Sequence, residues 1–236
     1  MASHIVKSFD AELAALDRIA AEMGGLAETQ LADAFAAIDK RDPKLAGKAI
    51  TSDRNIDALE RQLQERAIAM IAKRQPMAND LRHIMTVLKI AGDLERIGDL
   101  AKSIAKRANA ISNEAHPRPL IAGLRHMTEL AHRQLKDVLD AFSARDDAKA
   151  LGVWRSDAGL DELYNSVFRE LLTYMMEDPR NIGLCTHLLF GAKNIERIGD
   201  HTTNIAENIH YLVTGQLLSD DRPKGDDTST VMIPKP

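Results

Sequence analysis

The six residues LERIGD at positions 94–99 return almost unchanged as IERIGD at positions 195–200. Each copy places two acids four residues apart, and residues at that spacing are neighbours on one face of a helix. Two like charges at that spacing destabilise a helix by a few tenths of a kcal/mol. An unfavourable pair of acids that occurs twice indicates either a duplicated segment that kept the pair without a function for it, or a site that needs both carboxylates.

The repetition extends beyond this motif. SDRNIDALE at 52–60 matches SDAGLDELY at 156–164, and the turn proline Pro76 matches Pro179. The offset between the copies falls from 104 residues at the first match to 101 at the ERIGD motifs. Such a drift is expected for a duplicated helical unit whose hairpin is slightly shorter in one copy. The chain is therefore expected to consist of two similar halves.

Apolar spacing and proline turns divide the chain into six expected helices. Apolar residues recur at intervals of three and four, which is the period of a helix with one buried face. Asp42-Pro43 and Asp178-Pro179 each place an N-cap residue before a proline suited to the first helical position. The helices are expected over about 5–38, 43–73, from beyond Pro76 to about 111, 119–143, 147–177, and 179–213.

These elements predict an all-α fold of two tandem, pseudo-symmetric three-helix bundles. The first bundle is expected over residues 1–114 and the second over 120–214, and the two should superimpose. The proline-rich break at 115–119 is expected to be the linker. Residues 215–236 are polar and proline-bearing, so they have too little apolar surface to order themselves and are expected to form a flexible tail.

The composition argues against several classes of protein. The formal net charge of −4 and the absence of a Lys/Arg run give no reason to expect nucleic-acid binding. The one cysteine, Cys185, cannot form an internal disulfide framework or a thiolate metal cage, which favours a cytoplasmic location. No apolar run approaches the ~18 residues of a membrane span, so membrane contact is expected only peripherally, through partners.

Two further acid pairs accompany the repeated motif, one on the second and one on the fifth expected helix. Residues equidistant from the turn of an antiparallel hairpin lie side by side. The four acids of each half fall at the same level within about one helical turn, so each half can gather four carboxylates. The candidate metal ligands are Asp53, Asp57, Glu95 and Asp99 in the first half, and Asp157, Asp161, Glu196 and Asp200 in the second.

Four carboxylates at close range require either a cation or raised pKa values. Hard oxygen ligands suit magnesium, manganese, calcium or iron, and carboxylates also bind zinc. The acids follow the apolar line of their helices by one position, so they are expected at the margin of the core. Gly98 and Gly199 lie beside them and leave room for waters, bridging ions or a close helix. The alternative is a solvated face on which Arg96 and Arg197 pair with neighbouring acids.

Two other hypotheses compete with a regulatory metal site. The ExxH spacing of ferritin-like di-iron ligands occurs at Glu129–His132 and again at Glu207–His210. These matches fall at unequal positions on the fourth and sixth expected helices, without a matching pair of lone Glu ligands. A metal-free helical adaptor is the other hypothesis. The metal content of the purified protein, and its loss on substitution of the acids by Ala, distinguishes the regulatory metal site from these two hypotheses.

The two repeats, the stretch HIVKSFDAEL at 4–13, and ERIGD continued by H-x-x-N-I-A-E together resemble the PhoU family of bacterial phosphate-signalling regulators. The resemblance covers residues 4 to about 214. It implies two three-helix bundles that bind metal clusters through the paired acids, so the eight acids named above would be ligands of iron, zinc, manganese or magnesium, possibly in a multinuclear site. 

The same resemblance implies a function without catalysis. Members of the family act as accessory negative regulators. They link the ATPase subunit of the phosphate ABC transporter to a phosphate-sensing histidine kinase. A homodimer is expected as well, because elongated bundles leave apolar faces to share.

The two copies differ just after the motif. The second copy reads ERIGDHTTNIAENIH and the first reads ERIGDLAKSIAKRAN. Lys102, Ser103 and Lys106 therefore stand opposite Thr203, Asn204 and Glu207. The extra cations of the first copy leave open whether its site is occupied.

Overall fold

The computed structural model describes residues 2–114 and 118–218, and every regular element in these ranges is helical. Residues 115–117 of the expected linker and 219–236 of the expected tail lie outside the described residues. The elements are α1 (Ala2–Lys40), α2 (Pro43–Arg74), α3 (Asn79–Ala110), α4 (Arg118–Ala144), α5 (Asp147–Arg155), α6 (Asp157–Glu177), η1 (Pro179–Asn181) and α7 (Ile182–Thr214).

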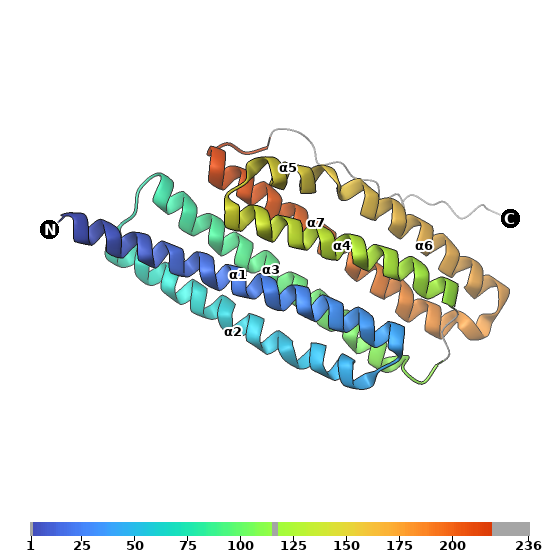
Figure 1. The fold of residues 1–236 in the computed structure, drawn as a ribbon. Helices are drawn as coiled ribbons and strands as arrows, with labels where there is room; N and C mark the ends of the chain where they lie inside the picture. Colours follow the sequence, from blue (N-terminus) through green and yellow to red (C-terminus); the bar gives the residue numbers. More distant parts are fainter. Residues whose placement is uncertain (1, 115–117, 219–236) are drawn as a thin grey trace.

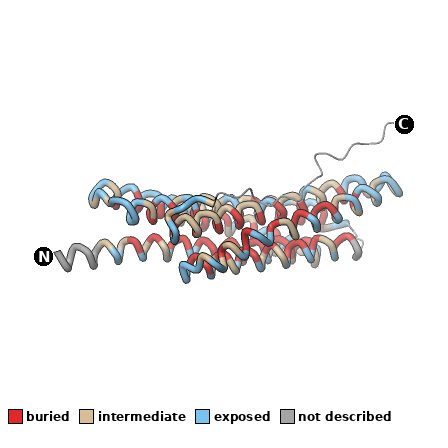
Figure 2. The backbone as a smooth tube through the Cα atoms, turned by 90° about the horizontal axis from the view of Figure 1, so that it is seen from above, coloured by how far each residue is buried: buried red, intermediate tan, exposed pale blue. Residues whose placement is uncertain are grey.

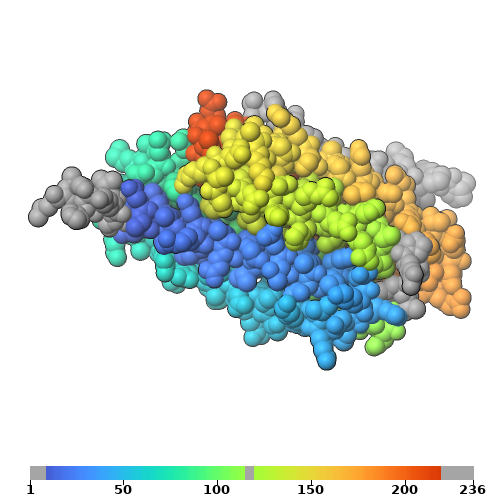
Figure 3. Space-filling view, in the orientation of Figure 1, coloured from blue at the N-terminus to red at the C-terminus, as the bar shows by residue number. Residues whose placement is uncertain are grey.

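The helices form two bundles that lie side by side along their length (Figure 1). Helices α1, α2 and α3 pack against one another, and α4, α5, α6 and α7 form the second group. The groups meet where α3 packs against α7 and where α1 packs against α4. Figure 3 shows α1 and α4 as neighbours on one face of the molecule. The all-helical fold of two repeats is as predicted.

The core is continuous between the two groups, as the buried positions in Figure 2 indicate. Helices α3 and α7 join its two halves, because each packs against its own bundle and against the other helix. Leu94 and Ile97 on α3 and Ile195 and Ile198 on α7 have no exposed surface. The two ERIGD motifs therefore lie on the two most enclosed helices of the molecule.

The expected helix starts are confirmed by the hydrogen bonds of their caps. The Asp42 carboxylate accepts from the backbone N–H of Lys44 at 2.8 Å, directly before Pro43 opens α2. The Asp178 carboxylate accepts from the N–H of Arg180 at 3.0 Å. Pro179 begins one turn of 3₁₀ helix, η1, before α7 continues.

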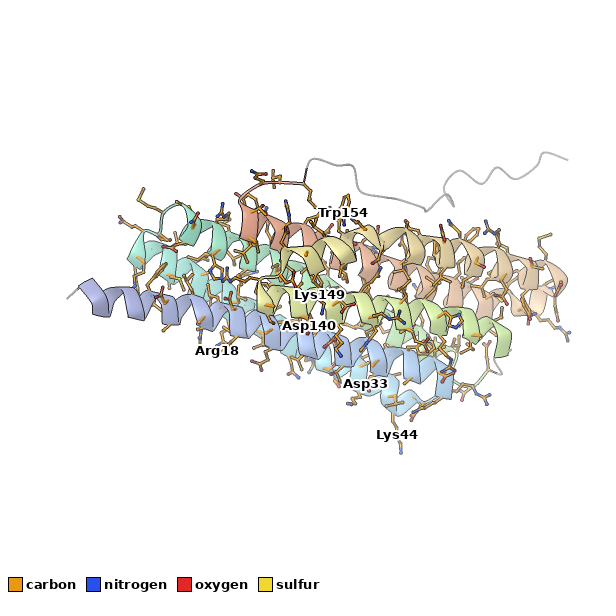
Figure 4. All side chains as sticks on the ribbon, turned by 45° about the horizontal axis from the view of Figure 1, so that its top comes forward. Arg18, Asp33, Lys44, Asp140, Lys149 and Trp154 are labelled. Carbon is orange, nitrogen blue, oxygen red and sulfur yellow. The ribbon has the colours of Figure 1, made fainter. Side chains whose placement is uncertain are left out.

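The prediction of one helix over 147–177 is wrong, because the chain turns at Ser156 between α5 and α6. The side-chain amide of Gln134 on α4 donates to the Ser156 carbonyl at 3.1 Å and to its hydroxyl at 3.0 Å. The same carbonyl accepts from the backbone N–H of Gly159 at 3.3 Å, three residues later in the first turn of α6. Helix α5 is also tied to α4, because Lys149 pairs with Asp140 at 2.9 Å (Figure 4).

None of the helices in the described ranges has the length and apolar character required to cross a membrane.

Candidate metal-binding sites

The structure brings the predicted acids together at one place in each repeat. The first acidic site, formed by Asp53, Asp57, Glu95 and Asp99, lies between α2 and α3. The second acidic site, formed by Asp157, Asp161, Glu196 and Asp200, lies between the start of α6 and the middle of α7. In the first site one ammonium group reaches acids of both helices. In the second, acids of both helices interact electrostatically with one glutamate.

The acids lie deeper than the sequence predicted. Asp53, Asp157, Asp161 and Glu196 are only 2–5% exposed, so the expectation that the acids lie at the margin of the core is wrong for these residues. The cause is the close approach of the helices that carry them. The margin is occupied instead by the half-buried acids, which are Asp57, Glu95, Asp99 and Asp200.

The motif glycines allow this close approach. A Cβ on Gly199 would overlap the Leu160 side chain of α6. A Cβ on Gly98 would lie 2.9 Å from Cδ1 of Ile56 on α2 and 3.2 Å from Oε1 of Gln30 on α1. Of the roles predicted for these glycines, the structure supports close helix packing.

A lysine holds the centre of the first acidic site. The Lys102 ammonium donates to Oδ2 of Asp53 at 2.5 Å and to Oδ1 of Asp99 at 3.4 Å. The side-chain amide of Gln30 donates to the other Asp53 oxygen at 3.4 Å. Both oxygens of the buried Asp53 carboxylate are thus occupied. The hydrogen bond with Asp53 raises the pKa of Lys102, so the ammonium is held charged.

The rim of the first site is an ordinary surface network. Arg96 lies 3.4 Å from Glu95 and 3.7 Å from Asp99. Burial raises the pKa of Glu95, and the charges of Asp99 and Glu60 raise it further, while Arg96 opposes the shift. No hydrogen bond or ion pair joins the Asp57 carboxylate to another described side chain. The pairing of Arg96 with neighbouring acids, which the sequence left open, is therefore present here.

The second acidic site has a different charge arrangement. Lys193 donates to Oε1 of the buried Glu196 at 2.9 Å, while Oε2 has no hydrogen-bond partner among the described residues. Burial raises the pKa of Glu196 to about 7, and the neighbouring Asp200 and Asp161 carboxylates add to the shift against the hydrogen bond from Lys193. The Thr203 hydroxyl donates to Oδ1 of Asp157 at 3.1 Å.

The two sites fit a cation to different degrees. Within residues 2–114 and 118–218, no three His, Cys, Asp or Glu side chains already stand in an arrangement that could hold a metal ion. The second site nevertheless offers hard oxygen donors, including a buried carboxylate oxygen of Glu196 that lacks a partner. In the first site an ammonium group already stands between Asp53 and Asp99, so its residues do not fit a metal as they stand.

Sequence reasoning missed two glutamines that support the sites. Gln30 on α1 and Gln134 on α4 are buried. Gln30 donates its amide to Ala49 and Asp53 of α2, and Gln134 donates to Ser156 directly before α6. Each also has a buried Oε1 without a hydrogen-bond partner in the described chain. The sequence contains a signal for them, because Gln30 and Gln134 are 104 positions apart, the same offset that relates the repeated SD stretches at 52–60 and 156–164.

The two ExxH motifs do not meet in one centre. Glu129 and His132 line a groove of about 590 Å³ between α1 and α4. Glu207, on α7, instead accepts a hydrogen bond from the Trp154 indole at 3.0 Å. His210 lies 2.7 Å from Asp147. Their separation removes the geometric basis for a ferritin-like di-iron site.

Fold and sites together define an all-helical protein of two tandem repeats, with one carboxylate cluster between α2 and α3 and the other between α6 and α7. The family model described as PhoU domain matches residues 20–108 and 124–209. The chain therefore belongs to the PhoU family, which the sequence resemblance predicted.

Similar proteins agree along nearly the whole chain. The phosphate-specific transport system accessory protein PhoU homolog of Rhizobium meliloti (strain 1021) is 56% identical over 229 residues, covering 97% of both chains. The phosphate-specific transport system accessory protein PhoU of Escherichia coli (strain K12) is 41% identical over 213 residues, covering 90% of this chain and 88% of its own.

A crystal structure of PhoU from Pseudomonas aeruginosa superimposes with a TM-score of 0.85 at 39% identity, covering 88% of this chain and all of that one (100%). PhoU from Streptococcus pneumoniae, described as a phosphate transport system regulatory protein, gives 0.81 at 28% identity, covering 89% of this chain and 99% of that one. The PhoU family is one of accessory regulators rather than enzymes, so the expectation of a non-enzymatic protein is confirmed by membership.

Proposed function

We propose that this chain is a negative regulator of phosphate uptake and of phosphate-starvation signalling. It acts by contact, joining the ATPase subunit of the phosphate ABC transporter to a phosphate-sensing histidine kinase on the cytoplasmic side of the membrane. Membership in a family whose relatives are phosphate transport accessory proteins is the observation that carries the proposal. While phosphate is abundant, the regulator holds the kinase in its non-signalling state and restrains uptake.

The proposal includes a metal bound through the paired acids, with the second acidic site as the better candidate. Asp157, Asp161 and Asp200 would offer carboxylate oxygens, and Glu196 would give up the proton that its raised pKa allows it to keep near neutral pH. A bound divalent ion, such as manganese, magnesium, zinc or iron, would neutralise these charges and stabilise the contact of α6 with α7.

Exposed apolar side chains support contact with other chains. Met77 lies in the turn between α2 and α3, and Leu81 and Met85 follow in the first two turns of α3; the three are 38–80% exposed. Ile182 and Phe190 on α7 are about half exposed, at 49% and 51%. Large apolar side chains left in solvent at element ends are typical of interaction surfaces. A homodimer through one such end is part of the proposal.

A pull-down from cells grown with phosphate tests the function. The tagged full chain should recover the transporter ATPase and the sensor kinase. A strain in which residues 1–214 are deleted should express phosphate-starvation genes although phosphate is abundant. Recovery of neither partner, together with a normal starvation response in the deletion strain, would reject the proposal.

The same pull-down with the double variant Glu196→Gln/Asp200→Asn tests whether the second acidic site matters for contact. Both substitutions keep the shape of the side chain and remove charge. Lys106→Thr, at an exposed position of α3, is the matched control and should recover both partners as the wild type does.

A further inference from the structure

Internal symmetry places Lys102 and Thr203 at the same position of the two repeats. Each stands three residues after the last residue of its ERIGD motif. Each donates a hydrogen bond to the first acid of the acid pair on the neighbouring helix. Lys102 donates to the buried Asp53, and Thr203 donates to its counterpart Asp157. At this position of the repeat the first site therefore has an ammonium group and the second has a neutral hydroxyl.

We propose that Lys102 is the built-in cation of the first acidic site, so that only the second acidic site of this chain takes up a divalent metal. The inference rests on the metal binding proposed above and deepens it. The Lys102 ammonium lies within 3.4 Å of oxygens from both α2 and α3. A divalent ion bound by Asp53 and Asp99 would have to occupy the same space, and the displaced ammonium would repel it.

The lysine of the second acidic site comes from a different position of its repeat. Lys193 reaches Glu196 from the preceding turn of α7, with 37% of its side chain exposed, and its ammonium lies 4.9 Å from the centre of the Tyr164 ring. It leaves Oε2 of Glu196, a residue only 5% exposed, without a hydrogen-bond partner among the described residues. A buried carboxylate oxygen that lacks a hydrogen-bond partner and lies among other carboxylates can be satisfied by an added cation.

In the first repeat, the position equivalent to Lys193 is occupied by Gly92, so the first site has no counterpart of this lysine. Two exchanges therefore distinguish the sites, Lys102 in place of Thr203 and Gly92 in place of Lys193. Both oxygens of the buried Asp53 are occupied in the first site, whereas the buried Glu196 of the second keeps one oxygen without a hydrogen-bond partner. The chain as a whole would bind metal at one of its two repeats.

Metal content of chelator-treated full-length protein, loaded with Mn²⁺ and desalted, tests the proposal by elemental analysis. The double variant Glu196→Gln/Asp200→Asn should lose the bound manganese of the wild type. The matched variant Glu95→Gln/Asp99→Asn should keep all of it. Both pairs exchange charge for an amide of the same shape, and circular dichroism checks that each remains helical.

The variant Lys102→Thr gives the first site the residue that the second site has at this position and should double the manganese bound per chain. Adding Glu95→Gln/Asp99→Asn to Lys102→Thr should return the content to that of the wild type. Lys106→Thr removes a nearby exposed cation and should leave the content unchanged.

Three outcomes would overturn the proposal. The wild type could lose about half of its manganese in Glu95→Gln/Asp99→Asn, which would show that both sites load while leaving metal binding itself intact. The variant Lys102→Thr could fold and bind no more than the wild type. Absence of manganese from every variant, the wild type included, would overturn the inference and the proposed metal function together. The comparison of Glu196→Gln/Asp200→Asn with Glu95→Gln/Asp99→Asn leaves Lys102 unchanged, so it tests the proposal even if Lys102→Thr does not fold.

Discussion

In the first acidic site the buried Asp53 meets the ammonium of Lys102, whereas in the second its counterpart Asp157 meets the hydroxyl of Thr203. The surrounding helices, the motif glycine and the supporting glutamine are the same in both repeats. The two clusters nevertheless receive their ammonium groups from different positions, Lys102 on the buried Asp53 in the first and Lys193 on the buried Glu196 in the second. The repeated acid motif therefore determines where the carboxylates gather, and the residues one turn before and after it determine which acid is paired with a lysine.

The rims of the sites differ in the same sense. Beside Glu95 stands a further acid, Glu60, whose charge raises the pKa of Glu95. The equivalent position beside Glu196 is Tyr164, against which Lys193 packs. The first site spreads a larger number of charges over a more open surface. The second concentrates fewer charges in a more buried place, which is the condition that shifts pKa values most.

The largest expected effect comes from removing the built-in cation. Lys102→Met should destabilise the metal-free protein by about 3 kcal/mol, because it leaves the carboxylate of Asp53 buried without its partner. The figure is at the low end for a buried ion pair, since 27% of the Lys102 side chain is exposed and Asp53 keeps its bond from Gln30. Urea unfolding measures it.

The equivalent change in the second repeat should cost less. Thr203→Val removes one hydrogen bond to Asp157 and should destabilise by about 1–2 kcal/mol. Lys106→Met, at an exposed position, should change stability by less than about 0.5 kcal/mol. Equal losses for Lys102→Met and Thr203→Val would mean that the two centres are not electrostatically different.

The second expected effect is a pH dependence that belongs to the second site. The pKa of Glu196 rises from 4.5 to about 7 on folding, so the folded chain holds a proton there that the unfolded chain has lost. The resulting stabilisation is complete below about pH 4.5 and is lost as the pH rises through about 7. Glu196→Gln should remove this decline and make the metal-free protein more stable near pH 8 by at most about 3 kcal/mol.

Glu95 is the equivalent residue of the first site and provides the matching measurement. Glu95→Gln should change the pH profile in the same direction and by less, because Glu95 is more exposed and Arg96 lies beside it. Unfolding curves collected with chelator from pH 5 to 8 give both profiles. A Glu196→Gln profile that still falls as steeply as that of the wild type would contradict the raised pKa.

The smallest expected effect concerns the glycines that bring the helices together. Gly199→Ala should destabilise by about 1–2 kcal/mol, because overlap with Leu160 outweighs the gain in helix propensity. Gly98→Ala should cost less, since its Cβ would meet the end of Ile56 at 2.9 Å. Gly47→Ala has open space and should stabilise α2 by up to about 1 kcal/mol. Thermal unfolding ranks the three, and the reverse order for the two motif glycines would contradict the packing described.

Much of the fold could be predicted because its signals are local. The caps at Asp42 and Asp178 and the apolar periods of α3 and α7 depend on residues close in sequence. The turn at Ser156 could not be predicted in this way. It depends on Gln134, which reaches it from another helix and has no local signature.

The positions of the candidate sites could be predicted from the sequence, but the burial and the ion pairs of their acids could not. Hairpin geometry placed the acid pairs side by side, and the extra cation at position 102 could be read from the aligned copies. The depth of Asp53 and Glu196 depends on how closely the helices approach and on the packing of α3 against α7. Which acid the ammonium of Lys102 contacts also depends on three-dimensional distance. Domain boundaries, the identity of the metal and the partners remain predictions.

The inequivalence of the two acidic sites is tested most directly by anomalous diffraction from crystals of the full chain grown with Mn²⁺. A single anomalous peak is expected among Asp157, Asp161, Glu196 and Asp200, with none beside Lys102. A peak of similar height between Asp53 and Asp99, or a peak there alone, would contradict the account.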